Sequence, residues 1–206
     1  MKNVTILDYG MGNIKSLYNA IKFLGYKPLF YSEKKKIHSE ISILPGVGAF
    51  NHAMKLISKK KIKKDINDFI NNKNNKLIGI CLGMQLLFNE SSENNRTKGL
   101  DIISGKISKL SSKKSNILPN VGWSETIIDK NNKYKYLYQF NRKKFYYVHS
   151  YHANPRYKKN QLASAYFNEK KICAIAVKNN VIGTQFHPEK SSKIGLDFLD
   201  CIINNH

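Results

Sequence analysis

Cys81 lies in the segment Gly79-Ile80-Cys81-Leu82-Gly83, between a short apolar run and the start of a helical pattern. Small residues two positions before and after a nucleophile are typical of a strand–turn–helix elbow, which exposes the reactive side chain on strained backbone. The following helix N-terminus would place free N–H groups and positive dipole beside the sulfur, which favours the thiolate. The pattern predicts a nucleophilic cysteine. The alternative is a structural cysteine at a buried strand end.

A cysteine nucleophile needs a base, and the base needs an acceptor that orients it. His187 and Glu189 follow a late apolar run, in Gln-Phe-His-Pro-Glu-Lys-Ser. His187 can be the base, Glu189 can hold its other ring nitrogen, and Pro188 stiffens the backbone between them. A histidine in a surface loop is the alternative, but none of the other five histidines has a carboxylate in so rigid a setting.

The third element is the turn Pro45-Gly46-Val47-Gly48, which follows an apolar run. Acyl transfer needs N–H donors aimed at the developing oxyanion. A glycine-rich turn can present such amides, and its glycines permit peptide orientations that other residues resist. Taken alone, the turn is equally consistent with an ordinary connection between a strand and a loop.

These segments need a scaffold of strands and helices, and the apolar spacing predicts one. We expect early helices over residues 14–24 and 53–70, a further helix opening at 84–88, and a last helix over 194–203. Polar loops are expected at 71–76 and 91–98. The predicted strands cover residues 4–9, 28–31, 41–44, 77–80, 105–110, 125–128, 145–151, 163–167, 172–178 and 181–185.

Strands separated by helices, followed by a run of strands, indicate an α/β fold. We expect a three-layer arrangement, with a mostly parallel central sheet, helices on both faces and a small antiparallel extension from the second half. With no repeat and no composition break, residues 1–206 are expected to form a single domain. The active site should lie at the carboxyl ends of the strands.

Composition excludes several classes of protein. No apolar run reaches the roughly 18 residues of a membrane span, and Asp8 interrupts the first apolar run, as a secretory signal would not allow. The three cysteines show no CxxC spacing, so neither a disulfide framework nor a zinc site is expected. We therefore expect a cytoplasmic protein.

The formal net charge of +21 suggests a nucleic-acid partner, because basic side chains neutralise phosphates. Only three of the 35 basic residues are arginines, although bidentate recognition of phosphate or guanine favours arginine. Abundant lysine and asparagine with little arginine is typical of AT-rich coding. The lysines are interpreted as solvated surface, and no nucleic-acid partner is expected.

The three chemical motifs together resemble the triad (class I) glutamine amidotransferases. More narrowly, they are similar to the glutaminase subunits of imidazole glycerol phosphate synthase, which work in histidine biosynthesis. The resemblance runs from residue 4 to about residue 200, and implies a flavodoxin-like core. Further matching segments lie at 8–13, 98–100, 121–123, 147–151 and 191–195.

The resemblance implies hydrolysis of glutamine to glutamate and ammonia. Cys81 would attack the side-chain amide, His187 would protonate the departing ammonia, and water would hydrolyse the glutamyl thioester. No metal or organic cofactor is implied. The residues implied in holding the oxyanion or the bound glutamine are Gly46, Val47, Gly48, Leu82, Gln85, Ser150 and Tyr151.

The resemblance also implies a partner. In the family, ammonia crosses to a cyclase subunit with a (β/α)₈ barrel, and the heterodimer forms imidazole glycerol phosphate and aminoimidazole carboxamide ribonucleotide. The glutaminase is nearly silent until the cyclase binds its own ligand. Trp123 is a candidate interface anchor, with packing in the core as its alternative. By motif position, Asn13 and Lys190 are further interface candidates.

One segment departs from the family pattern. The family usually has Pro-His-x-Gly-Trp-Asn, whereas this chain has Asn120 and Ser124 at the second and last positions. Both lie near the expected partner face, so a sugar amidotransferase of surface-polysaccharide synthesis is an alternative ammonia acceptor. A non-catalytic scaffold predicts erosion of the triad, which is intact. A cysteine protease or a nucleic-acid binder has no motif beyond the thiol or the charge.

Overall fold

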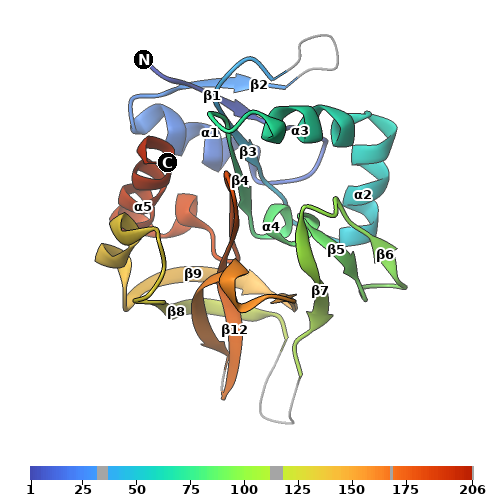
Figure 1. Cartoon of the computed structure of the whole chain (residues 1–206), viewed down its shortest axis with the longest axis vertical. Helices are drawn as coiled ribbons and strands as arrows, with labels where there is room; N and C mark the ends of the chain where they lie inside the picture. Colours follow the sequence, from blue (N-terminus) through green and yellow to red (C-terminus); the bar gives the residue numbers. More distant parts are fainter. Residues whose placement is uncertain (32–36, 112–117, 168, 206) are drawn as a thin grey trace.

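The computed structural model describes residues 1–31, 37–111, 118–167 and 169–205, and its main feature there is a nine-stranded central sheet (Figure 1). Four neighbouring pairs at one side are parallel and the four at the other side are antiparallel. In spatial order the strands are β2 (Lys27–Phe30), β1 (Asn3–Ile6), β3 (Ile41–Leu44), β4 (Lys76–Ile80), β13 (Val181–Thr184), β12 (Lys170–Lys178), β11 (Gln161–Phe167), β8 (Asn120–Ile128) and β9 (Lys143–His149).

The parallel half places the three chemical motifs side by side. β3, β4 and β13 are adjacent, and every residue of these strands is buried. Continuous burial of this kind is expected where helices cover both faces of a parallel sheet. The carboxyl ends of these strands lead directly into the turn at 45–48, into Cys81 and into the segment 185–189. They therefore converge at one edge of the sheet, as open α/β sheets require of a ligand site.

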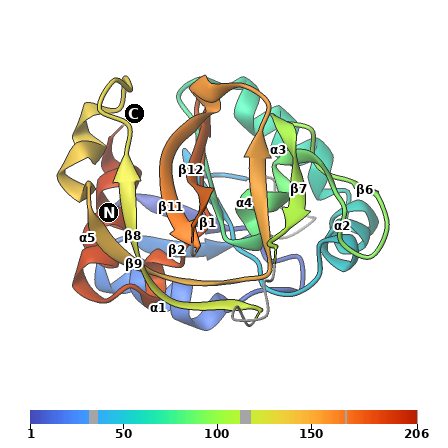
Figure 2. The same cartoon turned by 90° about the horizontal axis from the view of Figure 1, so that it is seen from below.

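Four helices cover the parallel half, two on each face (Figure 2). α1 (Ile14–Phe23) and α5 (Ser192–Asn204) pack on one face, whereas α2 (Phe50–Lys59) and α3 (Ile62–Asn71) pack on the other. α1 begins where the Asn13 side chain accepts the Ser16 N–H at 3.3 Å. Capping groups of this kind satisfy the free N–H groups of a first helical turn.

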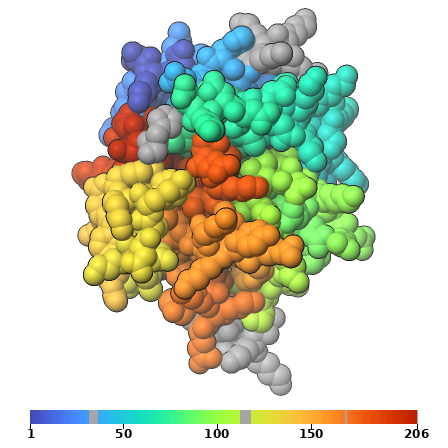
Figure 3. Space-filling model, viewed as in Figure 1, coloured from blue at the N-terminus to red at the C-terminus, as the bar shows by residue number. Residues whose placement is uncertain are grey.

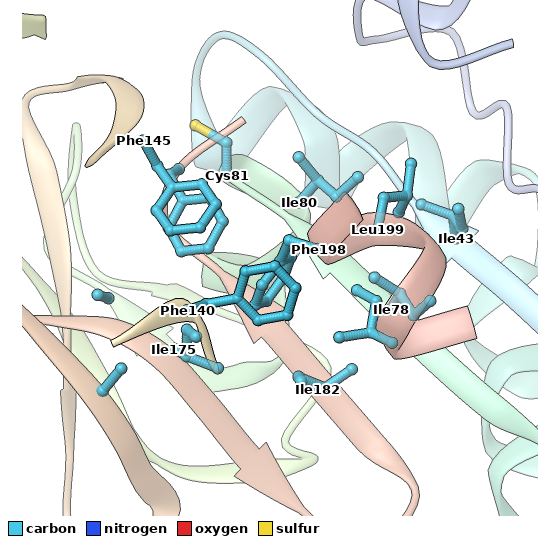
Figure 4. Close-up of a cluster of buried hydrophobic side chains, with 14 of the residues drawn as sticks. Ile43, Ile78, Ile80, Cys81, Phe140, Phe145, Ile175, Ile182, Phe198 and Leu199 are labelled. Carbon is cyan, nitrogen blue, oxygen red and sulfur yellow. The ribbon is translucent and has the colours of Figure 1, made fainter. Parts of the chain in front are cut away.

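The two faces of the sheet give two apolar cores. On the α1/α5 side, Ile43 and Ile78 pack with Phe198 and Leu199 of α5, and Figure 4 shows Cys81 at the rim of this cluster. On the α2/α3 side, alternate strand residues such as Leu44 and Leu77 pack with Phe50, Ile57 and Phe69. This alternation follows from the two-residue period of a strand.

The chain forms more sheet than the sequence predicts. Besides the antiparallel half of the central sheet, a four-stranded sheet joins β10 (Tyr151–Pro155), β7 (Ile103–Lys109), β5 (Phe88–Ser91) and β6 (Thr97–Lys98) in that order. The expected extension from the second half is therefore wrong in part, because β5 and β6 come from the first half. The β5–β7 pair is parallel and the other two are antiparallel. In the space-filling view the yellow and orange segments of the second half of the chain cover one end of the molecule (Figure 3).

The single helix expected over residues 53–70 is wrong, because the chain turns at Lys61 and forms α2 and α3. Lys61 adopts a left-handed conformation, with φ 55°. Ile57 and Ile62 are both fully buried, and five positions correspond to about 140° of helical rotation. A continuous helix would direct one of them to solvent, so a change of direction is needed to bury both.

The helix expected from Met84 onward is also shorter than predicted, since α4 covers only Leu82–Leu86 and β5 follows at Phe88. Main-chain N–H groups of a later segment donate hydrogen bonds to the carbonyls at the end of this helix. Leu100 N–H donates to the Leu86 carbonyl, and Ile102 N–H donates to the Leu87 carbonyl, both at 2.9 Å. The later segment also brings in β6, inside the loop expected at 91–98.

The strand expected over 145–151 divides at Ser150 into β9 and β10, which belong to different sheets. Phe145, Tyr147 and His149 are buried at alternate positions, but the next buried residue is His152. The buried set therefore changes phase by one residue, and a straight strand cannot bury both parts. The Ser150 carbonyl accepts the Leu110 N–H at 2.8 Å at this corner.

Among the residues that the structure describes, no helix has the length and apolar character needed to cross a membrane.

Candidate active site

Cys81 occupies the sharp turn between β4 and the five-residue helix α4. Its backbone has φ 54° and ψ −109°, in a region that side chains other than glycine rarely adopt. The Cys81 N–H donates to the Thr184 carbonyl of the neighbouring segment at 2.7 Å, which holds the turn in place. Strained backbone that the surroundings enforce is common at reactive residues. This is the geometry that the sequence predicts for a nucleophile elbow.

Glycines on both sides of the elbow allow the backbone to pack closely around it. A Cβ atom at Gly83 would collide with the carbonyl oxygen of Leu44. A Cβ atom at Gly46 would lie 2.9 Å from the Cβ of Leu82, inside normal van der Waals contact. The turn at 45–48 therefore lies directly against the first residue of α4, and any larger side chain at Gly46 or Gly83 would push them apart.

Glu189 lies in a short 3₁₀ turn, Pro188–Lys190, that follows β13, and His187 lies just before this turn. Nδ1 of His187 lies 2.8 Å from Oε1 of Glu189, and the two side chains are 2% and 4% exposed. Because the carboxylate can only accept, Nδ1 carries the proton. Nε2 is then the ring nitrogen that can exchange a proton with a nucleophile.

The charges of Cys81 and His187 are coupled. Burial disfavours the imidazolium and so lowers the pKa of His187. The negative charge of a Cys81 thiolate and its attraction for the ring N–H act in the opposite direction, and the Glu189 carboxylate adds a smaller effect of the same sign. Together they raise the pKa of His187 to about 10. Nε2 has no partner of good hydrogen-bond geometry among the described residues, so the attraction acts without a closed hydrogen bond. Such contacts commonly tighten when substrate binds.

The other two cysteines are poorer nucleophiles. Burial raises the pKa of the Cys173 thiol well above its ordinary value. Burial, and then the charge of Asp200, also raise the pKa of Cys201. Both thiols are therefore held in the protonated form, whereas the thiolate is the reactive species. Cys81 alone has a histidine and carboxylate pair beside it.

The candidate oxyanion turn is fixed by a buried tyrosine. The hydroxyl of Tyr9, which is fully buried, donates to the Pro45 carbonyl at 2.9 Å. Burial, and then the charge of Cys81, raise the pKa of Tyr9 well above its usual value, so the hydroxyl stays a donor. Val47 is 38% exposed and Gly48 has φ 100°. The role of Tyr9 was missed from the sequence, although it lies inside the matching segment 8–13.

Gln85 meets the end of β13 and the start of β10. Its Nε2 donates to the Tyr151 carbonyl at 2.9 Å and to Oε1 of Gln185 at 3.1 Å. Nε2 of Gln185 in turn lies 3.8 Å from the Cys81 sulfur. Sequence reasoning missed Gln185, and the signal for it was its position two residues before His187. The Ser150 carbonyl instead accepts the Leu110 N–H. Only some of the residues expected to bind glutamine therefore converge at this point.

The predicted interface residues lie on the surface around this edge. Trp123 is 49% exposed, which decides against packing in the core. Its ring lies edge-on to that of Tyr146, with 6.2 Å between the ring centroids. Lys190 is exposed in the turn after His187. Asn13 is partly buried and uses its side-chain oxygen to cap α1.

Comparison with known proteins identifies the family. A family model described as Glutamine amidotransferase class-I matches residues 5–199, a range that includes Cys81, His187 and Glu189. The chain belongs to the class-I glutamine amidotransferases.

Two members of this family illustrate the similarity in sequence. Imidazole glycerol phosphate synthase subunit HisH of Caldanaerobacter subterraneus subsp. tengcongensis is 40% identical over 197 residues, which cover 95% of each chain. The subunit of the same name from Bacillus subtilis is 39% identical over 202 residues, covering 95% of this chain and 93% of that one.

Solved structures of glutamine amidotransferases share the fold at lower identity. A chain of PurLQS from Thermotoga maritima superposes with a TM-score of 0.74 at 17% identity, covering 98% of both chains. At this identity the likeness concerns the fold alone. It confirms the predicted α/β class, a central sheet between helices, while the antiparallel part is larger than expected.

Proposed function

We propose that the chain hydrolyses glutamine through a Cys81–His187–Glu189 triad and delivers the ammonia to a cyclase subunit that forms imidazole glycerol phosphate in histidine biosynthesis. The observation that carries the proposal is the His187–Glu189 pair, 2.8 Å apart and buried, coupled electrostatically to a cysteine on strained backbone. The relatives named as subunits of imidazole glycerol phosphate synthase support the pathway. Residues 1–206 act in this proposal as one glutamine amidotransferase domain in the cytoplasm.

The first half of the reaction forms a thioester. The Cys81 thiolate attacks the side-chain carbonyl carbon of glutamine, and the carbonyl electron pair moves to oxygen. Collapse of this tetrahedral species breaks the C–N bond, while His187 passes its Nε2 proton to the departing nitrogen, which leaves as ammonia. Glu189 holds Nδ1 and stabilises the imidazolium before the transfer.

The second half regenerates the enzyme. Neutral His187 accepts a proton from water as the water oxygen attacks the thioester carbon. The C–S bond then breaks, which releases glutamate and restores the thiolate beside an imidazolium. The oxyanion formed in each half is held by main-chain N–H groups, for which we propose Leu82, at the free N-terminus of α4, and the Val47–Gly48 segment. The hydrogen bond from the Tyr9 hydroxyl to the Pro45 carbonyl keeps this segment beside the elbow.

We assign glutamine recognition to Gln85, with main chain at Gly46, Ser150 and Tyr151. Both N–H groups of the Gln85 amide are engaged, by the Tyr151 carbonyl and by Gln185. The orientation of the amide is therefore set before substrate arrives, and its oxygen is the end that can accept from glutamine. A recognition group held in place in advance loses less entropy on binding.

The cyclase partner, a (β/α)₈ barrel in a heterodimer, would dock at the same edge. Trp123 is the proposed anchor, with Asn13 and Lys190 as further contacts. Tryptophan is enriched among residues that dominate interface energy because it buries a large rigid surface. Trp123 and the neighbouring Val121 are both exposed on β8, at 49% and 58%.

The test is glutamate release from glutamine by the purified chain, alone and with its cyclase plus the cyclase's nucleotide ligand. We expect strong stimulation by the liganded cyclase and complete loss in Cys81→Ala. Activity that ignores the cyclase would keep the glutaminase and assign the ammonia to another acceptor, such as a sugar amidotransferase. Absence of activity with every partner would contradict the proposal and favour a non-catalytic scaffold.

A further inference from the structure

Asn120, which is half-buried, and the buried His149 form a pair next to the candidate glutamine site. They lie opposite each other on the antiparallel strands β8 and β9. Nδ2 of Asn120 lies 3.2 Å from Nε2 of His149, and Nδ1 of the same ring lies 2.9 Å from the Tyr151 carbonyl. His149 is 6% exposed, and none of the steps above uses it.

The two hydrogen bonds of His149 require one and the same tautomer. The Tyr151 carbonyl can only accept, so Nδ1 of His149 must carry a proton. The Asn120 amide nitrogen can only donate, so Nε2 must be an unprotonated acceptor. An imidazolium would direct a second N–H at the Asn120 donor. Burial, the largest effect, also lowers the pKa of His149 to about 4, so the neutral ring is the stable form.

The ring is linked to glutamine recognition through a shared acceptor. The Tyr151 carbonyl receives one hydrogen bond from His149 and another from Nε2 of Gln85 at 2.9 Å. If His149 rotated or placed its proton on Nε2, the carbonyl would face a ring nitrogen lone pair. The peptide would then reorient, and the Gln85 amide would lose the acceptor that fixes it.

We propose that Asn120 is a positioning residue for glutamine: it holds His149 as the Nδ1–H tautomer, which fixes the Tyr151 carbonyl and, through it, the Gln85 side chain. The inference rests on the proposed function and deepens its substrate recognition. A neutral histidine at position 120 could donate an N–H to His149 as the asparagine amide does, so it would satisfy the same requirement.

The tautomer is read directly from the ¹⁵N chemical shifts of the His149 ring in the purified chain, which needs no turnover. The affinity for glutamine is read by calorimetry on the complex with the cyclase, in a Cys81→Ala background that cannot consume the substrate. The variants are Asn120→Leu, which removes the donor, Asn120→Asp, which offers only acceptors, and Asn120→His, which restores a donor. Asn74→Leu, at an exposed site, is the matched control.

We expect the Nδ1–H tautomer in the parent chain. Glutamine affinity should fall about tenfold in Asn120→Leu, the scale of one lost hydrogen bond. In Asn120→Asp, the neutral His149 ring should move its proton to Nε2 to face the carboxylate, with a similar loss. Asn120→His should stay within about threefold of the parent, since the donor is restored, and Asn74→Leu should equal it.

An Nε2–H tautomer in the parent chain would overturn the inference, and so would unchanged glutamine affinity in Asn120→Leu. If Asn120→Leu fails to fold, Asn120→Asp provides the same test, because aspartate has nearly the same shape as the asparagine that it replaces. Failure of the proposed function has a different signature. The parent complex would then release no glutamate, while the tautomer and the binding series would still decide the role of Asn120.

Discussion

The N–H of His187 donates to the carbonyl of Tyr146 at 2.9 Å, so strand β9 holds the candidate base of the triad. Ser191 completes the link: its hydroxyl accepts the Tyr146 N–H at 2.9 Å and donates to the His187 carbonyl at 2.6 Å. The Tyr146 ring contacts Trp123 on the surface. The expected partner surface and the catalytic base are therefore joined through one residue.

Replacing Ser191 by alanine should reduce kcat for glutamine more than it changes KM. The substitution leaves the Tyr146 N–H without its partner and removes one of the two hydrogen bonds of the His187 carbonyl, which keeps the Lys190 N–H at 3.1 Å, at about 1–3 kcal/mol of stability. We expect a rate reduction of about tenfold, and Ser191→Thr should recover most of it. Ser192→Ala, at the exposed neighbour, is the control for changes at the start of α5. Equal effects of both alanine variants would remove Ser191 from this role.

Replacing Trp123 by alanine should weaken binding of the cyclase without lowering thermal stability. An interface anchor of this type contributes about 2 kcal/mol or more, so the Kd should rise by about 30-fold or more. Tyr166→Ala is the matched control, because Tyr166 and Trp123 are each 49% exposed. Titration calorimetry with the cyclase would measure both. A Kd that is the same for the two variants would exclude Trp123 as an anchor.

Replacing Gly83 by alanine should disturb the elbow and abolish measurable glutaminase activity. The added methyl group collides with the Leu44 carbonyl, and relieving such a contact costs roughly 1–3 kcal/mol. Gly25→Ala separates this clash from backbone strain, since Gly25 has φ 82° but open space around it. Gly25→Ala should lose some stability and keep activity, as urea unfolding and glutamate release would show. Full activity in Gly83→Ala would be incompatible with the close packing around the elbow.

The pKa of His187 should fall when Cys81 is replaced by alanine. The thiolate charge opposes the effect of burial and, before Glu189, raises the pKa of His187 to about 10. This pKa lies above the ordinary histidine value of about 6.5. Protonation of His187 therefore stabilises the folded state fully below about pH 6.5, and this contribution is lost as the pH rises through about 10. NMR titration of His187 in the parent chain and in Cys81→Ala would measure the change. Identical titration curves would show that Cys81 does not carry the charge.

The sequence was most informative where chemistry depends on neighbours in the chain. Gly-Ile-Cys-Leu-Gly and His-Pro-Glu carry their own local geometry, and the buried strands before them could be recognised as apolar runs. Gln185 was missed because its meaning depends on Gln85, a hundred positions earlier in the chain. The corner at Ser150 depends on the distant Leu110 in the same way. Periodicity alone does not report contacts of this range.

The break between α2 and α3 is a different case, since its cause was present in the sequence. Ile57 and Ile62 lie at a spacing that one helical face cannot accommodate, but the lysine-rich segment between them still has high helix propensity. Burial of both isoleucines outweighed that propensity.

The most direct test of the triad is to map where a glutamine-shaped diazoketone alkylates the chain, by peptide mass spectrometry in the presence of the liganded cyclase. The label should appear on Cys81 alone, excess glutamine should block it, and Cys173 and Cys201 should stay unmodified because burial raises the pKa of both thiols. Labelling of Cys201 at a comparable rate, or no glutamine-protected label on Cys81, would contradict the assignment of Cys81 as the nucleophile.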